Sequence, residues 1–154
     1  MAFEVFISYS HQDRELQKKL AIALSNLRNQ KLISDWFDGD ITPGTEWKKQ
    51  ILAHLAQDQI ILLLISPDFM ASDFCYSIEM QQAITRHDHN QARVIPIILR
   101  PTDWEGTPFE KLLALPSDGR PITSWPDQDQ AFLDVIKGIR RAIKDLNTHL
   151  PANP

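Results

Sequence analysis

The chain has 154 residues, of which 43% are hydrophobic and 23% are charged, and its formal net charge is −4 at pH 7. This composition is typical of one folded domain, and it argues against a disordered chain and against a nucleic-acid binder, which would carry a basic face. The single cysteine, Cys75, excludes an internal disulfide and a zinc site built from cysteines. Because the sequence shows neither a signal peptide nor an apolar run of about 18 residues, we expect a cytoplasmic chain without a membrane span.

Buried strands are predicted by short apolar runs that alternate with helical patterns. Continuous runs of this kind are typical of parallel sheets that are covered on both faces. Pro96 interrupts one of them, and because proline donates no backbone hydrogen bond, this strand is predicted to lie at a sheet edge or to carry a bulge. The five predicted strands cover Phe3–Ser8, Leu32–Phe37, Gln59–Ile65, Arg93–Leu99 and Pro121–Trp125.

Apolar residues at helical spacing predict helices between these strands. Ser10, Thr45 and Ser72 are candidate N-caps, and the helix after Ser72 is predicted to continue to about Arg86. The other predicted helices contain Leu16–Leu27, Trp47–Leu55, Phe109–Leu115 and Phe132–Ile143. This order predicts an α/β fold over residues 1–149: a three-layer, flavodoxin-like domain with a five-stranded parallel sheet of order 2-1-3-4-5 and helices on both faces. Residues 150–154 are predicted to be a tail or the start of a linker.

The ligand site of such a sheet is predicted at the carboxyl ends of its strands, at the point between the first and the third strand where the strand order reverses. The segments that follow these ends are Ser8–Ser10, the loop Asp38–Glu46 and Ser66–Pro67. No glycine follows the first strand directly, and the chain has neither a phosphate-binding GxxxxGKS/T loop nor a GxSxG nucleophile elbow. The histidines lack metal-ligand spacing, so no metal site is predicted.

Six segments stand out by their order and spacing. They are FEVFISYS at 3–10, the loop at 38–44, Trp47, LLLISPDFMASDFCYSIEM at 62–80, VIPIILRPTDW at 94–104 and ITSWP at 122–126. Together they resemble a Toll/interleukin-1 receptor (TIR) domain of the bacterial type over about residues 3–145. The resemblance implies the same flavodoxin-like fold that the alternation of strands and helices predicts.

The resemblance also implies an activity. Many bacterial TIR domains are similar to NAD⁺ glycohydrolases, which split NAD⁺ into nicotinamide and ADP-ribose or a cyclic ADP-ribose product. This implies NAD⁺ as a substrate, no cofactor, and self-association into a homo-oligomer or filament that triggers signalling in bacterial antiphage defence. Two alternatives stay open: a non-catalytic module that only recruits other TIR domains, and a sensor that binds a nucleotide without cleaving it. No nucleic-acid or membrane partner is predicted.

Glu79 is the residue at which the resemblance implies catalysis. Because nicotinamide leaves as a neutral molecule, no general acid is needed, and one carboxylate can stabilise the oxocarbenium-like transition state. The segment from Cys75 to Glu79 is one residue longer than in the common family pattern Ser-x-aromatic-Cys-x-x-Glu. Either the helix starts differently or contains a bulge, or Glu79 points elsewhere. On one continuous helix, Cys75 and Gln82 would share a face with Glu79.

The remaining site residues come from the resemblance and from the carboxyl end of the first strand, where Ser8 and Tyr9 lie. Phe74 and Tyr76 are alternative candidates for the aromatic ring that stacks on the substrate, and both also fit a hydrophobic core. Cys75 is interpreted as a small buried residue and not as a nucleophile. The predicted substrate-binding residues are Ser8, Tyr9, Asp38, Phe74, Cys75 and Tyr76, and the predicted self-association loop, which also gates the substrate, contains Asp40, Ile41, Pro43 and Gly44.

Overall fold

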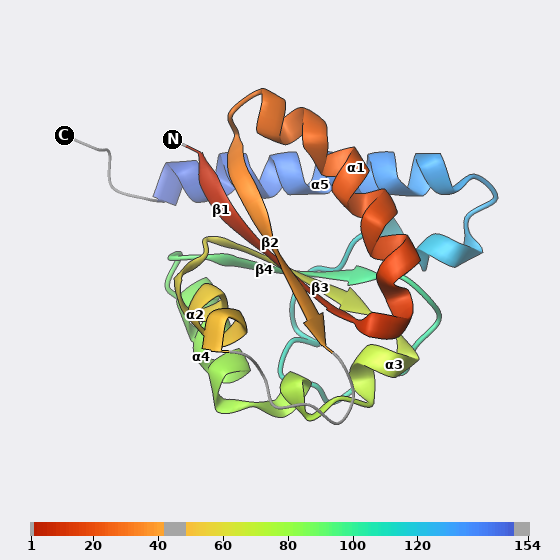
Figure 1. Ribbon diagram of the computed structural model, residues 1–154, viewed down its shortest axis with the longest axis horizontal. Helices are drawn as coiled ribbons and strands as arrows, with labels where there is room; N and C mark the ends of the chain where they lie inside the picture. Colours follow the sequence, from red (N-terminus) through yellow and green to blue (C-terminus); the bar gives the residue numbers. More distant parts are fainter. Residues whose placement is uncertain (1, 42–48, 150–154) are drawn as a thin grey trace.

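The computed structural model describes residues 2–41 and 49–149 (Figure 1). Its sheet contains β1 (Phe3–Ser10), β2 (Ile33–Ile41), β3 (Ile60–Ile65) and β4 (Arg93–Ile98). Its helices are α1 (Arg14–Asn29), α2 (Lys49–Gln57), α3 (Pro67–Met70), α4 (Ile78–Asp88) and α5 (Gln128–His149). Four short 3-10 helices complete the described elements: η1 (His11–Asp13), η2 (Asp73–Tyr76), η3 (Ser117–Gly119) and η4 (Ile122–Ser124).

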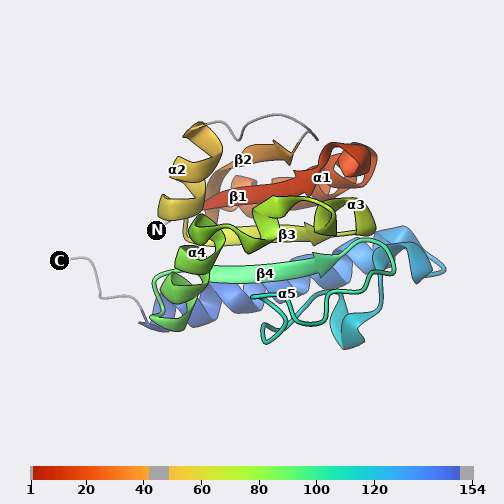
Figure 2. The same ribbon diagram turned by 90° about the horizontal axis from the view of Figure 1, so that it is seen from below.

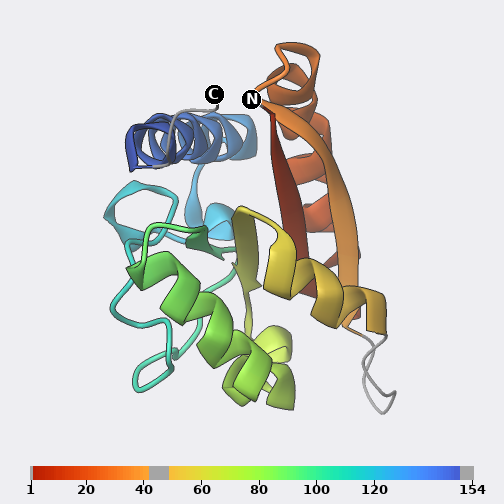
Figure 3. The same ribbon diagram turned by 90° about the vertical axis from the view of Figure 1, so that its left-hand side faces the viewer.

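The sheet is parallel, and its order is β2-β1-β3-β4, as Figure 2 shows from one side. Helices α1 and α5 cover one face, and α2 and α4 cover the other (Figure 3). Side chains on β1 alternate between these faces: Val5 and Ile7 pack with α1 and α5, whereas Phe6 packs with α2 and α4. The predicted α/β, flavodoxin-like architecture is therefore confirmed.

The predicted strand count is wrong, because the described part of the sheet has four strands and not five. Residues predicted as the last strand form η4 instead, in which the backbone N–H of Trp125 donates to the carbonyl of Ile122. Leu115 makes one isolated bridge to Ile97, and the next residue, Pro116, has no N–H with which to extend a ladder. The short helix predicted near this segment is also wrong, since only turns and bends are found between 105 and 114.

The outer edge of β4 confirms the edge position that Pro96 predicts. The backbone N–H of Val94 donates to Nδ1 of His87 at 3.0 Å, and that of Ile98 donates to the carbonyl of Leu115 at 2.8 Å. Pro96, between them, has no N–H. The edge thus offers no free backbone donor at these positions, which protects it from pairing with another strand.

Two predicted boundaries near the site are wrong. The single helix predicted from Ser72 to Arg86 is broken, because Ser72 caps η2 and Ser77 caps α4 separately. Strand β2 continues to Ile41, so Asp38 and Asp40 lie in a strand and not in a loop. The predicted cap Thr45, and Trp47, fall outside the described residues, as do the predicted tail residues 150–154.

Candidate functional site

Ser8 has a buried hydroxyl at the carboxyl end of β1. Its side chain is fully buried, and Oγ has no hydrogen-bond partner among the described residues. Like Phe6, two residues earlier, it points to the face covered by α2 and α4. Its neighbour on β2 is Gly39, where a Cβ would lie 2.7 Å from the Phe6 ring and from the carbonyl oxygen of Ile7. A buried hydroxyl without a partner is rare, so this one stands out among the described side chains.

Tyr9, Asp38 and Asp40 point to the opposite face of the sheet. Tyr9 is buried among the residues that pack on α1 and α5. Burial, together with a hydrogen bond to the Asp38 carboxylate, raises the pKa of the Tyr9 phenol, which therefore stays protonated. Asp40 accepts a hydrogen bond from Nδ1 of His11 at 2.7 Å. The structure thus places Tyr9 and the exposed Asp38 across the sheet from Ser8 and does not bring them together with it.

The predicted self-association loop is described only in part. Asp40 and Ile41 are the last two residues of β2, and Ile41 is buried against the α2 and α4 side of the sheet. Pro43 and Gly44 lie outside the described residues.

Glu79 lies in the first turn of α4. The helix starts here because Ser77 has an extended backbone and its Oγ accepts a hydrogen bond from the N–H of Met80 at 3.1 Å. The Glu79 side chain is half-buried and makes no hydrogen bond or ion pair within the described part of the chain. A carboxylate at this position is stabilised by the positive end of the helix dipole.

The extra residue before Glu79 is absorbed by the break between η2 and α4. Of the three readings of that residue, a different helix start is the one observed. Cys75 therefore does not share a helical face with Glu79, as a continuous helix predicts, whereas Gln82 does lie on α4.

Helix η2 holds the three neighbouring candidates in different environments. Phe74 and Cys75 are fully buried among residues of the α2 and α4 side. The Cys75 thiol donates to the carbonyl of Phe69 at 3.3 Å, and burial raises its pKa to about 12, which agrees with a small buried residue and not with a nucleophile. Tyr76 is 55% exposed, so of the two aromatic candidates it is the one accessible to a ligand.

The sequence was compared with known proteins. Residues 5–136 match the family described as TIR domain. The chain belongs to the TIR-domain family. It is also 53% identical over 138 residues to uncharacterized protein y4lF of Sinorhizobium fredii (strain NBRC 101917 / NGR234), an alignment that covers 90% of this chain and 43% of the relative. The chain thus spans less than half the length of that relative.

A polar network that the sequence did not reveal joins three strand ends of this TIR domain. The carboxylate of Asp13, which lies after β1, accepts two hydrogen bonds. One comes from the hydroxyl of Ser66, which follows β3, and the other comes from Nε of Arg100, which follows β4, at 2.9 Å. Arg100 also contacts Asp68 at 2.6 Å. Asp13 and Ser66 are buried. The network holds the carboxyl ends of β1, β3 and β4 together, beside the place where such folds bind ligands.

The network's members are far apart in sequence, but each lies within three residues of a strand end. Polar residues at the ends of neighbouring parallel strands meet at one edge, and this rule was the available signal for them. Burial disfavours the charge of Arg100, but its hydrogen bonds to Asp68 and Asp13 outweigh that effect and raise its pKa. Arg100 therefore stays charged and neutralises Asp13.

No group of three or more metal-binding side chains is found in ranges 2–41 and 49–149. In the same ranges, no helix of this TIR domain is long and apolar enough to cross a membrane.

Proposed function

We propose that this TIR domain cleaves the bond between nicotinamide and ribose in NAD⁺, with Glu79 as the catalytic residue. One observation carries the proposal: in the first turn of α4, the Glu79 carboxylate pairs with no other described residue. Helix α4 covers the face of the sheet toward which the Ser8 hydroxyl, which also has no partner among the described residues, points. Membership of a family that includes NAD⁺ glycohydrolases supports it.

The chemistry suits a single carboxylate. When the C1′–N bond breaks, its electron pair goes to the pyridinium nitrogen, nicotinamide leaves as a neutral molecule, and positive charge develops on the ribose ring. An ionised Glu79 stabilises that charge and accepts hydrogen bonds from the ribose hydroxyls. Water then bonds to C1′ and loses a proton to solvent, which gives the linear product, or a nucleophilic nitrogen of the same molecule bonds to C1′ and gives the cyclic product. The Ser8 hydroxyl is proposed to hydrogen-bond the substrate, and the exposed Tyr76 to stack on it.

The test is NAD⁺ consumption by the purified protein, at high concentration or fused to an oligomerising partner, because we propose that self-association through the end of β2 activates it. Glu79→Gln keeps the shape of the side chain and removes its charge, and it is expected to reduce turnover by about a hundredfold or more. Glu15→Gln is the matched control, since Glu15 also lies in the first turn of a helix, α1, and is exposed. Equal activity of wild type and Glu79→Gln under forced assembly refutes the proposal, provided that thermal melting shows all three proteins folded.

A non-catalytic interaction module is the second candidate. The observation that favours it is an exposed apolar pair just before Glu79 in the sequence: Tyr76 is 55% exposed and Ile78 is 70% exposed. Side chains of this kind are typical of protein interfaces. In this case other TIR domains are the partners, and Tyr76→Ser with Ile78→Ser reduces self-association in sedimentation experiments while no variant or wild type consumes NAD⁺. Either activity is proposed to serve signalling in bacterial antiphage defence.

A further inference from the structure

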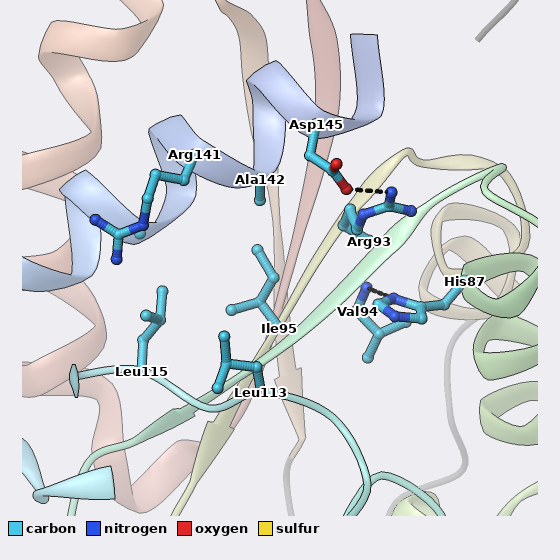
Figure 4. Close-up of a pocket in the computed structure, with 10 residues that line it drawn as sticks. His87, Arg93, Val94, Ile95, Leu113, Leu115, Arg141, Ala142 and Asp145 are labelled. Carbon is cyan, nitrogen blue, oxygen red and sulfur yellow. Dashed lines mark hydrogen bonds and ion pairs between the residues drawn. The ribbon is translucent and has the colours of Figure 1, made fainter. Parts of the chain in front are cut away.

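A cavity of about 330 Å³ lies between the edge of β4 and the C-terminal half of α5 (Figure 4). Its volume is within the range of small-molecule sites. Neither Glu79 nor Ser8 lines it, and the α4 residue that does, His87, comes from the opposite end of that helix. The cavity is therefore separate from the site proposed for NAD⁺ cleavage. Its walls are mainly apolar and include Val94, Ile95, Leu113, Leu115 and Ala142.

Leu113 shows that this apolar surface is open to ligands. Its side chain is 88% exposed although it lines the cavity. Figure 4 shows it near Leu115 and Ile95. Gly138 lines the same cavity from α5, and a Cβ there would lie 2.4 Å from the nearest atom of Leu115. Because Gly138 has no side chain, Leu115 can pack directly against α5 in the wall of the cavity.

The charges around the cavity are unbalanced. Arg93 is fully engaged, because it contacts Asp145 at 2.6 Å and also donates to the side chain of Asn90 and the carbonyl of Ala92. Arg141, which also lines the cavity, makes no hydrogen bond or ion pair within the described ranges. The same is true of three further cations on this stretch of α5: Lys137, Arg140 and Lys144.

The nearby acids do not neutralise these cations. Asp145 is paired with Arg93, and Asp134, earlier on α5, accepts hydrogen bonds from the backbone and hydroxyl of Ser117. Four cations that pair with no described residue thus occur within about two turns of one helix, in a chain whose net charge is −4. This local excess of positive charge attracts anions.

His87 adds a donor to the cavity wall. Its Nδ1 accepts the N–H of Val94, and burial together with the nearby Arg93 cation lowers its pKa, so the ring is neutral at pH 7. In that tautomer Nε2 carries the proton, and it has no hydrogen-bond partner among the described residues.

We propose that this cavity binds a small organic anion: an apolar, flat body the size of naphthalene that carries one acidic group. The body lies against the leucines and Ile95, and the acidic group pairs with Arg141. A peptide strand is a poor occupant, because the N–H groups of Val94 and Ile98 on this edge are already used and Pro96 has none.

The test uses two fluorescent probes of similar shape, anionic anilinonaphthalene sulfonate and neutral phenylnaphthylamine. The folded protein is expected to bind the anionic probe saturably and more tightly than the neutral one. Arg141→Gln is expected to raise the Kd of the anionic probe about tenfold and to leave that of the neutral probe unchanged. Lys144→Gln is the matched control, since it removes the same charge from the same helix but Lys144 does not line the cavity.

A second pair of variants tests the apolar wall. Leu113→Asp is expected to abolish binding of the anionic probe, whereas Leu133→Asp, at an exposed leucine of α5 outside the cavity, is expected to preserve it. Amide NMR shifts on adding the probe should centre on Gly138 and Ala142. Shifts centred elsewhere, equal binding of both probes, or equal effects of Arg141→Gln and Lys144→Gln refute the proposal. None of these measurements depends on NAD⁺ cleavage.

Discussion

Replacing Arg100 by Met is expected to destabilise the fold strongly, because it leaves the buried Asp13 carboxylate without its cation. In the native protein Arg100 contacts Asp13 at 2.8 Å and Asp68 at 2.6 Å. Removing one partner of a buried ion pair costs about 3–5 kcal/mol of unfolding free energy. Two features reduce this cost. Asp13 keeps its hydrogen bond from the hydroxyl of Ser66, and because the Arg100 side chain is 32% exposed, water replaces part of its interaction with Asp13. We expect a loss of about 2–3 kcal/mol.

Urea denaturation, followed by circular dichroism, measures this loss. With a slope of about 1–3 kcal/mol per molar urea for a small domain, the midpoint should fall by about 0.7–3 M. Lys111→Met is the control, since Lys111 also contacts an aspartate, Asp88, at 2.9 Å, but both side chains are exposed and the midpoint should hardly change.

A double variant distinguishes an unpaired charge from lost packing. Asp13→Asn together with Arg100→Met removes both charges, so it should be more stable than Arg100→Met alone. If the double variant is less stable than Arg100→Met, or if Arg100→Met shifts the midpoint no more than Lys111→Met does, the reasoning about Asp13 is refuted.

Three further predictions concern single residues. Gly39→Ala should lower the urea midpoint by the equivalent of about 1–3 kcal/mol, because its Cβ would overlap the Phe6 ring; an unchanged midpoint would contradict this. Arg86→Met should lower the melting temperature, since the Arg86 guanidinium donates to the last carbonyls of α2, those of Leu55 and Gln57, both at 3.3 Å. Stability should fall as the pH drops below about 6.5, because the unfolded chain protonates His87 before the folded one does, and His87→Gln should flatten this slope.

The sheet was predictable because most of its strands consist of continuous runs of apolar residues. Residues 60–65 are all buried, as a strand covered on both faces requires, and Pro96 identified the edge. The end of β2 was not predictable in the same way. Asp38, Gly39 and Asp40 are poor strand formers, and only pairing with Ile7, Ser8 and Tyr9 of β1 keeps them extended.

The first turn of α4 was harder to predict, because two serines compete to cap it. Ser72 and Ser77 are both suitable N-caps, and only the structure shows that each caps its own helix. The family resemblance therefore pointed to Glu79, and the sequence left a different helix start as one of three readings without deciding among them.

The arrangement of the remaining site residues was partly accessible from the sequence. Ser8 and Tyr9 were both predicted to bind the substrate, with the first strand ending at Ser8. The strand continues to Ser10, and because consecutive residues of a strand point to opposite faces, the two side chains lie on opposite sides of the sheet. By contrast, the contact between Asp13 and Arg100 joins residues 87 positions apart, and no local pattern predicts such a pairing.

Helix α4 connects the two proposed sites. Glu79 lies in its first turn and His87 in its last, and eight residues at about 1.5 Å each separate them by about 12 Å along the helix axis. Arg86, between them, ties the helix to the carbonyl end of α2. A ligand that contacts His87 therefore acts on the same rigid element that presents Glu79. If the anionic probe changes NAD⁺ turnover in wild type but not in Leu113→Asp, the two sites are coupled through α4. If turnover is unchanged while the probe binds, they are independent.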